Sequence, residues 1–322
     1  MISPSWGGAG AFPHRVEQGV RALQAMGFEV KFGQHALEQA GYVSASAEAR
    51  AADIHQLFRD PEVRLILAAI GGDHSCHLLP LLDFELIRDN PKLVMGYSDV
   101  TVLNVAIWQQ TGLVTCNGPA LLTDFAEHPA MLEYTKVWFE KVVRDPTPIG
   151  ELTPAPAWTE ETLSWERKLD LTRPRALTAS PGWSWVKGGR GEGVLAGGCI
   201  ESLQHLRGTR YWPEWNDVIL FFETSEEKPS PATVDGILMD YENMGVLRQL
   251  QGMIVGRPMR YSDTEKQELR EVVLERTRAY GFPIVCDVDF GHTAPQLTLP
   301  LGCRARLDAL AKRLTVLESA VS

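Results

Sequence analysis

Two stretches in the first half of the chain decide the fold: VRLILAAIGG at residues 63–72 and KLVMGYSDVTVLNVAIWQQTG at residues 92–112. Each begins with a short apolar run of the kind that forms a strand buried on both faces. The second passes through a polar turn into an apolar stretch that predicts a helix. Strands alternating with helices indicate a parallel sheet covered by helices on both faces.

The sequence around these stretches repeats the alternation. Helical spacing predicts helices over residues 15–27 and 47–60, and apolar runs predict strands over residues 28–33 and 113–119. We therefore predict an α/β unit over residues 1–145.

The middle of the chain differs in composition. Residues 146–180 contain several prolines and many polar residues, which is typical of a linker or an exposed excursion. Strand and helix patterns resume in residues 181–322, beginning with a glycine-rich segment and including the apolar run DVILFFE at residues 217–223. We predict a second α/β domain there.

Composition limits the class of protein. The net charge of −10 disfavours a nucleic acid polymer as partner, because such binding needs a cationic surface. The sequence shows no signal peptide and no apolar stretch long enough to cross a bilayer. The five cysteines are odd in number and contain no C-x-x-C, as expected for reduced thiols. We expect a cytoplasmic protein without a membrane partner.

Three predicted strand ends carry candidate functional residues, and ligands bind at this edge of open parallel sheets. The first is IGGDHS, residues 70–75, where paired glycines let backbone N–H groups approach a ligand. An ordinary glycine turn explains the same pattern. His74 and His77 could serve a metal-dependent amidase, but H-x-x-H on a loop is weak evidence, and we expect no metal.

The second strand end carries Ser98, between a predicted strand and a helix. A sharp turn there would expose the hydroxyl, and the N–H of Asp99 would point at a developing oxyanion. The alternative is that Ser98 or Asp99 simply caps the helix.

The third candidate is a pair, Glu223 at the end of DVILFFE and His292 in DVDFGHTAPQ. A buried carboxylate needs a partner, and a histidine on a glycine-flanked loop could supply one. A glutamate that orients an imidazole, which in turn deprotonates a serine, is the logic of a catalytic triad. The chain order Ser, Glu, His occurs in such triads.

Five segments, in order, resemble the LD-carboxypeptidase family of serine peptidases, and its microcin-immunity branch most closely. They are GGDHSCHLLPLLD, MGYSDVTVLNVAIW, GGCIESLQHLRGT, ILFFETSEEKPSP and DVDFGHTAPQLTLPLG. The resemblance implies a Rossmann-like N-terminal domain, a C-terminal domain with its own strands, an active site between them, a homodimer, and neither metal nor cofactor. The family has a short strand before its S-P-S segment, which here begins at Ser3. Two expectations follow for the N-terminal edge of the sheet: a truncated first strand, or a true start further upstream.

The resemblance also implies residue roles. Ser98 matches the nucleophile, Glu223 the orienting acid and His292 the base. The oxyanion donors would be the backbone N–H of Asp99 and one from the turn of Gly71, Gly72 and Asp73. Position 199 is a cysteine where many relatives have asparagine, and we give it no catalytic role.

Two substrates fit this reading: a murein tetrapeptide that loses its terminal D-alanine, or a peptidyl or aminoacyl nucleotide. Trp165, Trp183 and Trp185 could stack on a purine, although packing in a loop or interface explains them equally well. A non-catalytic nucleotide-binding module is the alternative from another class, but no G-x-G-x-x-G follows a strand and no P-loop is present.

Overall fold

Two sheets organise the computed structural model, which describes all residues from 1 to 322. The smaller sheet has the order β1-β2-β3-β12, in which the first three strands are parallel and β12 is antiparallel to β3. Its strands are β1 (Leu65–Leu67), β2 (Leu93–Met95), β3 (Thr115–Asn117) and β12 (Leu299–Leu301). The predicted parallel sheet is thus confirmed.

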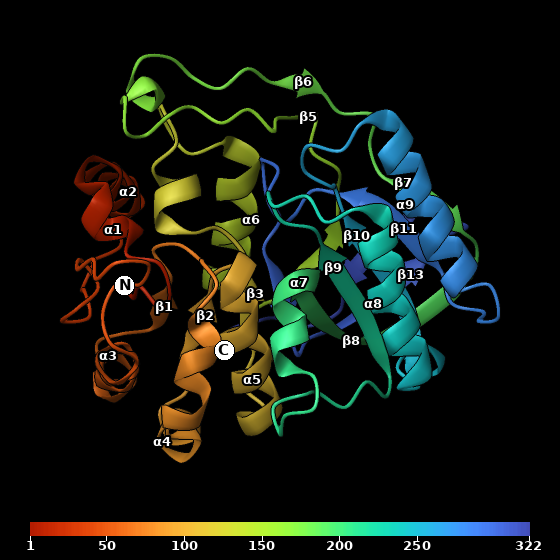
Figure 1. The fold of residues 1–322 in the computed structure, drawn as a ribbon, viewed down its shortest axis with the longest axis horizontal. Helices are drawn as coiled ribbons and strands as arrows, with labels where there is room; N and C mark the ends of the chain where they lie inside the picture. The colour runs from red at the N-terminus through yellow and green to blue at the C-terminus, as the bar shows by residue number, and fades with distance from the viewer.

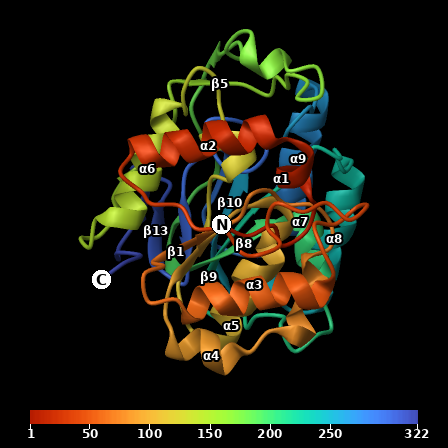
Figure 2. The same cartoon turned by 90° about the vertical axis from the view of Figure 1, so that its left-hand side faces the viewer.

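Helices cover both faces of this sheet. Figure 2 shows α2 and α6 on one side, and α3, α4 and α5 on the other. The helices of this half are α1 (Gly8–Ala11), α2 (Pro13–Ala25), α3 (Ala47–Arg59), α4 (Phe84–Asp89), α5 (Thr101–Thr111) and α6 (Glu133–Arg144). Helix α5 is buried along most of its length, which explains its nearly continuous apolar sequence.

The larger sheet has eight strands in the order β4-β14-β13-β8-β9-β10-β11-β7. Strands β8 to β11 run parallel, and antiparallel strands complete both edges. The bounds are β4 (Gly150–Leu152), β7 (Ser184–Lys187), β8 (Arg190–Cys199), β9 (Val218–Glu223), β10 (Leu250–Gly256), β11 (Ile284–Val288), β13 (Arg304–Asp308) and β14 (Arg313–Val316). The predicted combination of a parallel-sheet domain and a strand-rich α/β domain is confirmed.

Three helices accompany the larger sheet: α7 (Ile200–Leu203), α8 (Pro231–Asn243) and α9 (Asp263–Arg276). Helices α8 and α9 lie side by side against it (Figure 1). Ser262 and Glu265 form a capping box at the start of α9, because each side chain satisfies a backbone N–H of the other's residue. None of the helices combines the length and apolar character that a membrane crossing requires.

One predicted strand is wrong. Residues 28–33 alternate in burial as a strand would, yet they form no ladder. Apart from local bonds to Leu23 and Ala36, their backbone pairs with Met1, whose amine donates to the Lys31 carbonyl and whose carbonyl accepts from Gly33 N–H. With so short a partner, the alternation does not become a strand.

The chain crosses between the two halves more often than the predicted boundaries at residues 145 and 180 suggest. Strand β4 lies in the predicted excursion but pairs with β14 of the larger sheet. Strand β12 lies in the predicted C-terminal domain but completes the smaller sheet. The rest of the excursion carries a two-stranded sheet of β5 (Ala157–Trp158) and β6 (Thr178–Ala179). Such pairings join distant residues, which composition alone does not reveal.

Candidate active site

Ser98 lies on a strained turn between β2 and α5. Its backbone has φ of +60°, in the left-handed region that non-glycine residues seldom occupy. Strain of this kind persists where the surrounding structure imposes it, often at functional sites. A Cβ placed on Gly71 would lie 2.8 Å from Ser98 Cβ and 3.0 Å from Oγ. The glycine turn after β1 therefore packs directly on the serine, and only glycine fits at position 71.

The same turn carries the expected oxyanion donors. The backbone N–H groups of Gly71, Gly72 and Asp73 donate no hydrogen bond within the chain, so they are free to bind a ligand. The turn is held in place by Asp99, whose buried carboxylate accepts a hydrogen bond of 2.8 Å from Ser75 N–H. The geometry thus brings the two loops together beside Ser98.

Helix capping does not explain Ser98 or Asp99. The residue at the N-cap of α5 is Val100, and no side chain caps that terminus. The two residues belong to a short 3₁₀ turn that precedes the helix, and its N-terminus likewise lacks a side-chain cap. The serine hydroxyl is therefore not committed to the backbone.

Glu223 and His292 form a buried pair. Glu223 ends β9, and its Oε2 lies 2.8 Å from Nδ1 of His292. The carboxylate sits in a slot between two glycines, because a Cβ on Gly256 would come within 2.6 Å of Glu223 Cβ and one on Gly291 within 2.5 Å of Cγ. The ring of Tyr97, next to Ser98 in sequence, packs edge-on against His292 at 5.1 Å. These contacts fix the imidazole with Nδ1 toward the carboxylate.

Burial acts to lower the pKa of His292, but the neighbouring Glu223 and Glu226 outweigh it and raise that pKa to about 10. Burial raises the pKa of Glu223, and the charge of His292 opposes this rise. The pair therefore favours a protonated imidazole in the absence of substrate.

Glu226 is a site residue that the sequence analysis missed. Its Oε2 lies 2.9 Å from Nε2 of His292, at ion-pair distance but without the alignment of a hydrogen bond. Ser98 makes no hydrogen bond to His292 in this structure. The only sequence signal was an acidic residue three positions after Glu223, which looks like any solvated loop charge.

A cavity of about 570 Å³ opens beside His292. It is lined by residues from both halves of the chain and from the predicted excursion, whose residues 161–167 all face it. A main-chain bridge between Thr159 and Ala294 ties the excursion to the His292 loop. The excursion is therefore a wall of this cavity as well as a connection.

The three candidate tryptophans occupy different places. Trp165 lines the cavity, edge-on to Phe12 and beneath the Arg15 guanidinium, 4.7 Å from its ring centre. Trp183 donates its indole N–H to buried Asp289 at 2.7 Å, and Trp185 lies on edge strand β7. Neither Trp183 nor Trp185 lines the cavity.

His74, His77 and Cys199 make no hydrogen bond to the His292–Glu223 pair. The rings of His74 and His77 touch each other on the loop after Asp73, and His74 also touches Tyr42, with no further ligating side chain gathered there. Cys199 is buried opposite Glu223 in the β8–β9 ladder, and its N–H donates to Thr101. Burial raises the pKa of the Cys199 thiol well above its usual value, so it is inert.

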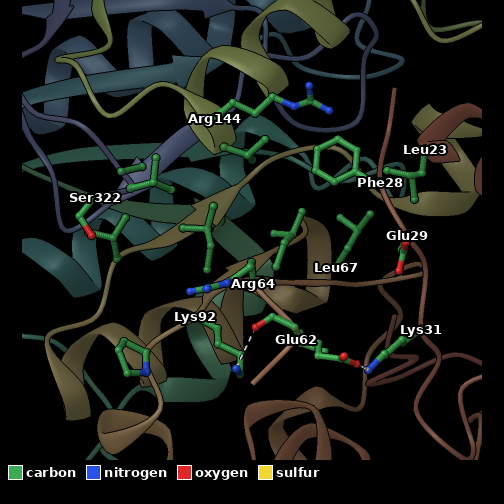
Figure 3. A pocket seen from close by; sticks show the side chains of 18 of the residues that line it. Leu23, Phe28, Glu29, Lys31, Glu62, Arg64, Leu67, Lys92, Arg144 and Ser322 are labelled. Carbon is green, nitrogen blue, oxygen red and sulfur yellow. Dashed lines mark hydrogen bonds and ion pairs between the residues drawn. The ribbon is translucent and has the colours of Figure 1, made fainter. Parts of the chain in front are cut away.

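A larger cavity, of about 970 Å³, lies at the opposite edge of the smaller sheet. Figure 3 shows Leu23, Phe28, Leu67 and Arg144 around it. It adjoins the amino ends of β1 and β2, whereas ligands of open parallel sheets bind at the carboxyl ends, where Ser98 lies. We therefore assign the functional site to the smaller cavity.

Comparisons with known proteins agree with this geometry. Residues 1–118 match the LD-carboxypeptidase N-terminal domain, and residues 192–307 match the LD-carboxypeptidase C-terminal domain. The microcin C7 self-immunity protein MccF of Escherichia coli is 32% identical over 312 residues, which cover 96% of this chain and 90% of that protein. A putative carboxypeptidase of Vibrio cholerae is 32% identical over 316 residues, covering 96% and 91%.

Solved structures show the same relationship. MccF in complex with aspartyl sulfamoyl adenosine superimposes with a TM-score of 0.92 at 32% identity, covering 100% of this chain and 96% of that one. An MccF-like protein from Streptococcus pneumoniae in complex with AMP gives 0.89 at 28% identity, covering 98% and 97%. With both domains matched and the fold shared throughout, this chain belongs to the LD-carboxypeptidase family of serine peptidases.

Proposed function

We propose that this protein hydrolyses an amide-type bond in a small modified peptide, with Ser98 as nucleophile, Glu223 as orienting acid and His292 as general base. The observation that carries the proposal is the buried Glu223–His292 contact of 2.8 Å, whose imidazole packs against Tyr97, the residue before a serine on a strained turn. A carboxylate that holds Nδ1 leaves Nε2 as the atom that accepts the serine proton.

The chemistry follows from these positions. His292 Nε2 takes the proton of Ser98 as Oγ attacks the carbonyl carbon, and the oxyanion accepts hydrogen bonds from backbone N–H groups of Asp99 and the turn of Gly72 and Asp73. The imidazolium then gives its proton to the leaving nitrogen, and the C–N bond breaks. Water, deprotonated by His292, hydrolyses the acyl-enzyme and restores Ser98.

For the substrate we propose a peptidyl or aminoacyl nucleotide. The support is Trp165, an aromatic side chain in the cavity wall, together with the nucleotide-like ligands named for two structural relatives. An indole face can stack on a purine, and the positive Arg15 lies next to it. Cleavage would separate the acyl carbonyl from the nitrogen of the nucleotide-like group.

A paired turnover assay tests this function. Aspartyl sulfamoyl-adenosine and murein tetrapeptide would each be incubated with the wild type and with Ser98→Ala. We expect hydrolysis of the adenosine conjugate by the wild type and loss of nearly all of it in Ser98→Ala, because the nucleophile is gone. Full activity in Ser98→Ala would exclude the mechanism.

Trp165→Ala separates stacking from general damage. Base stacking on an aromatic ring is worth about 1–3 kcal/mol, so KM for the conjugate should rise roughly fivefold to a hundredfold. The control is turnover of a substrate that lacks a nucleobase, and Trp165→Ala should leave it unchanged. An equal loss for both substrates would mean that Trp165 only supports the wall.

The second candidate function is removal of D-alanine from murein tetrapeptide. Several relatives are named carboxypeptidases, among them that of Vibrio cholerae, which favours this activity. Release of D-alanine without cleavage of the conjugate would select it. The homodimer that the family resemblance implies and the cytoplasmic location expected from the composition are part of either proposal, and sedimentation equilibrium would test the dimer.

A further inference from the structure

Glu226 lies against Nε2 of His292, the ring nitrogen that the proposed reaction needs as its base. The other ring nitrogen, Nδ1, is held by Glu223, so only Nε2 can take the proton of Ser98. In this structure Nε2 faces Glu226 Oε2 at 2.9 Å. A carboxylate there stabilises the imidazolium, and an imidazolium cannot act as a base.

The surroundings of the two carboxylates differ. Glu223 is fully buried between glycines and cannot move, whereas half of the Glu226 side chain is exposed, at 50%. The only ion pair of the Glu226 carboxylate is with His292, and its neighbour is Arg260, whose guanidinium approaches the Glu226 carbonyl at 3.4 Å. Glu226 can therefore turn away toward solvent and Arg260 with no ion pair to break other than the one to His292.

The other groups that face this pair do not replace Glu226. Tyr97 packs its ring edge against His292 and stays neutral, because burial raises its pKa well above the usual value. Glu201 and Cys199 interact with Glu223, and neither is among the groups that shift the pKa of His292. Glu226 and His292 both line the cavity, so a ligand bound there meets the carboxylate and the imidazole together.

We propose that Glu226 is a positioning residue that holds the general base in its protonated, inactive form until substrate enters the cavity and displaces it. This inference rests on the proposed function, since it assigns a regulation to the same His292. A substrate that fills the space beside Nε2 removes the carboxylate from the ring. The imidazole then loses its proton more readily and becomes a base only in the occupied site.

Glu226→Gln tests the proposal, with Glu227→Gln as the matched control. Glu227 is the next residue, is exposed, and its carboxylate makes no hydrogen bond or ion pair, so its variant loses the same charge from the same loop. The first readout is the pKa of His292 in the free protein, measured by NMR titration of ring-labelled histidine. The second is the rate at which a small fluorophosphonate labels Ser98 at pH 7.

Removal of a carboxylate in contact with a histidine lowers its pKa by roughly one unit or more, which raises the neutral fraction about tenfold. We therefore expect Glu226→Gln to lower the pKa of His292 and to speed labelling about tenfold, while Glu227→Gln changes neither. An unchanged His292 pKa in Glu226→Gln would overturn the proposal, as would a lower pKa with slower labelling.

The failure of the proposed function would look different. If neither the wild type nor Glu226→Gln were labelled at any pH, while the histidine titration still moved, the serine mechanism would be excluded. The NMR titration alone would then show whether Glu226 keeps the proton on His292.

Discussion

At the scale of single residues, glycines set the distances on which the proposed chemistry depends. Gly71 lets one turn lie against Ser98, and Gly256 and Gly291 form the slot that encloses Glu223. Each position leaves no room for a side chain, because an added Cβ would lie within 2.8 Å of a site atom. Because these glycines have no side chain, the backbone can pack directly against Ser98 and Glu223 and fix their positions.

Gly71→Ala should impair catalysis more than stability. The new methyl would press on Ser98 Cβ and Oγ, and a shift of about 1 Å in a reacting group can cost roughly a hundredfold in rate. We expect kcat/KM to fall about a hundredfold in a turnover assay. Gly236→Ala is the control, since it lies in α8 with open space around it and should leave activity unchanged. Equal activity of both variants would show that the Gly71 turn has room to adjust.

The raised pKa of His292 gives the proposed reaction a defined pH dependence, with His292 as its base. The base must be neutral, and kcat/KM reports the free enzyme, in which that pKa is about 10. The rate constant should therefore be low at neutral pH and still rise above pH 8. If substrate displaces Glu226, the acidic limb of kcat should lie at lower pH than that of kcat/KM. If the pH–rate profiles of kcat and kcat/KM both showed their acidic limb near pH 6.5, the raised pKa of His292 and the displacement of Glu226 by substrate would both be contradicted.

At the scale of elements, one buried carboxylate anchors the excursion that walls the cavity. Asp289 accepts hydrogen bonds from Ala155 N–H at 2.9 Å and from the Trp183 indole at 2.7 Å. It also pairs with buried Arg257 at 2.9 Å. The chain on either side of residues 156–182 thus meets at a single side chain, three residues before His292.

Asp289→Ala should loosen this wall and destabilise the protein. Removing one partner of a buried ion pair leaves an uncompensated charge and costs about 3–5 kcal/mol. Urea unfolding should show a loss of that size, and proteases should cut residues 156–182 faster. Glu275→Ala is the control, because its pair with Arg278 is exposed and such pairs contribute at most about 1 kcal/mol. A similar small loss in both variants would mean that Asp289 is not the anchor.

At the scale of the whole molecule, the alternating strands and helices could be predicted because buried apolar runs are local signals. The triad candidates could be predicted from strand ends and from the family resemblance. Strand β12 could not be predicted from the sequence, because it is three residues long, contains Pro300 and pairs with β3 from far along the chain. The contact between Glu226 and His292 could not be predicted either, because the sequence around an acidic loop residue is the same whether its side chain faces solvent or an imidazole.

The shared strand predicts that the two halves do not fold separately. Without β12, residues 1–145 would expose one edge of β3 and the apolar surface that Leu299 and Leu301 cover. We expect this fragment to aggregate or to lack a cooperative urea transition by circular dichroism, whereas the full chain unfolds in one transition. A cooperative transition in the fragment, at the midpoint of the full chain, would refute this.

The position of β12 late in the chain also determines when the parts of the site become available during synthesis. Ser98 leaves the ribosome long before His292 and the strand that closes the smaller sheet. The interval is roughly 10 to 40 s at usual elongation rates of about 5–20 residues per second. Throughout that period the nascent chain carries the proposed nucleophile without the proposed base, and the open edge of β3 is exposed to other chains. The hydrolase therefore becomes active only when its translation is nearly finished, and a chaperone that covers that edge would protect it until then.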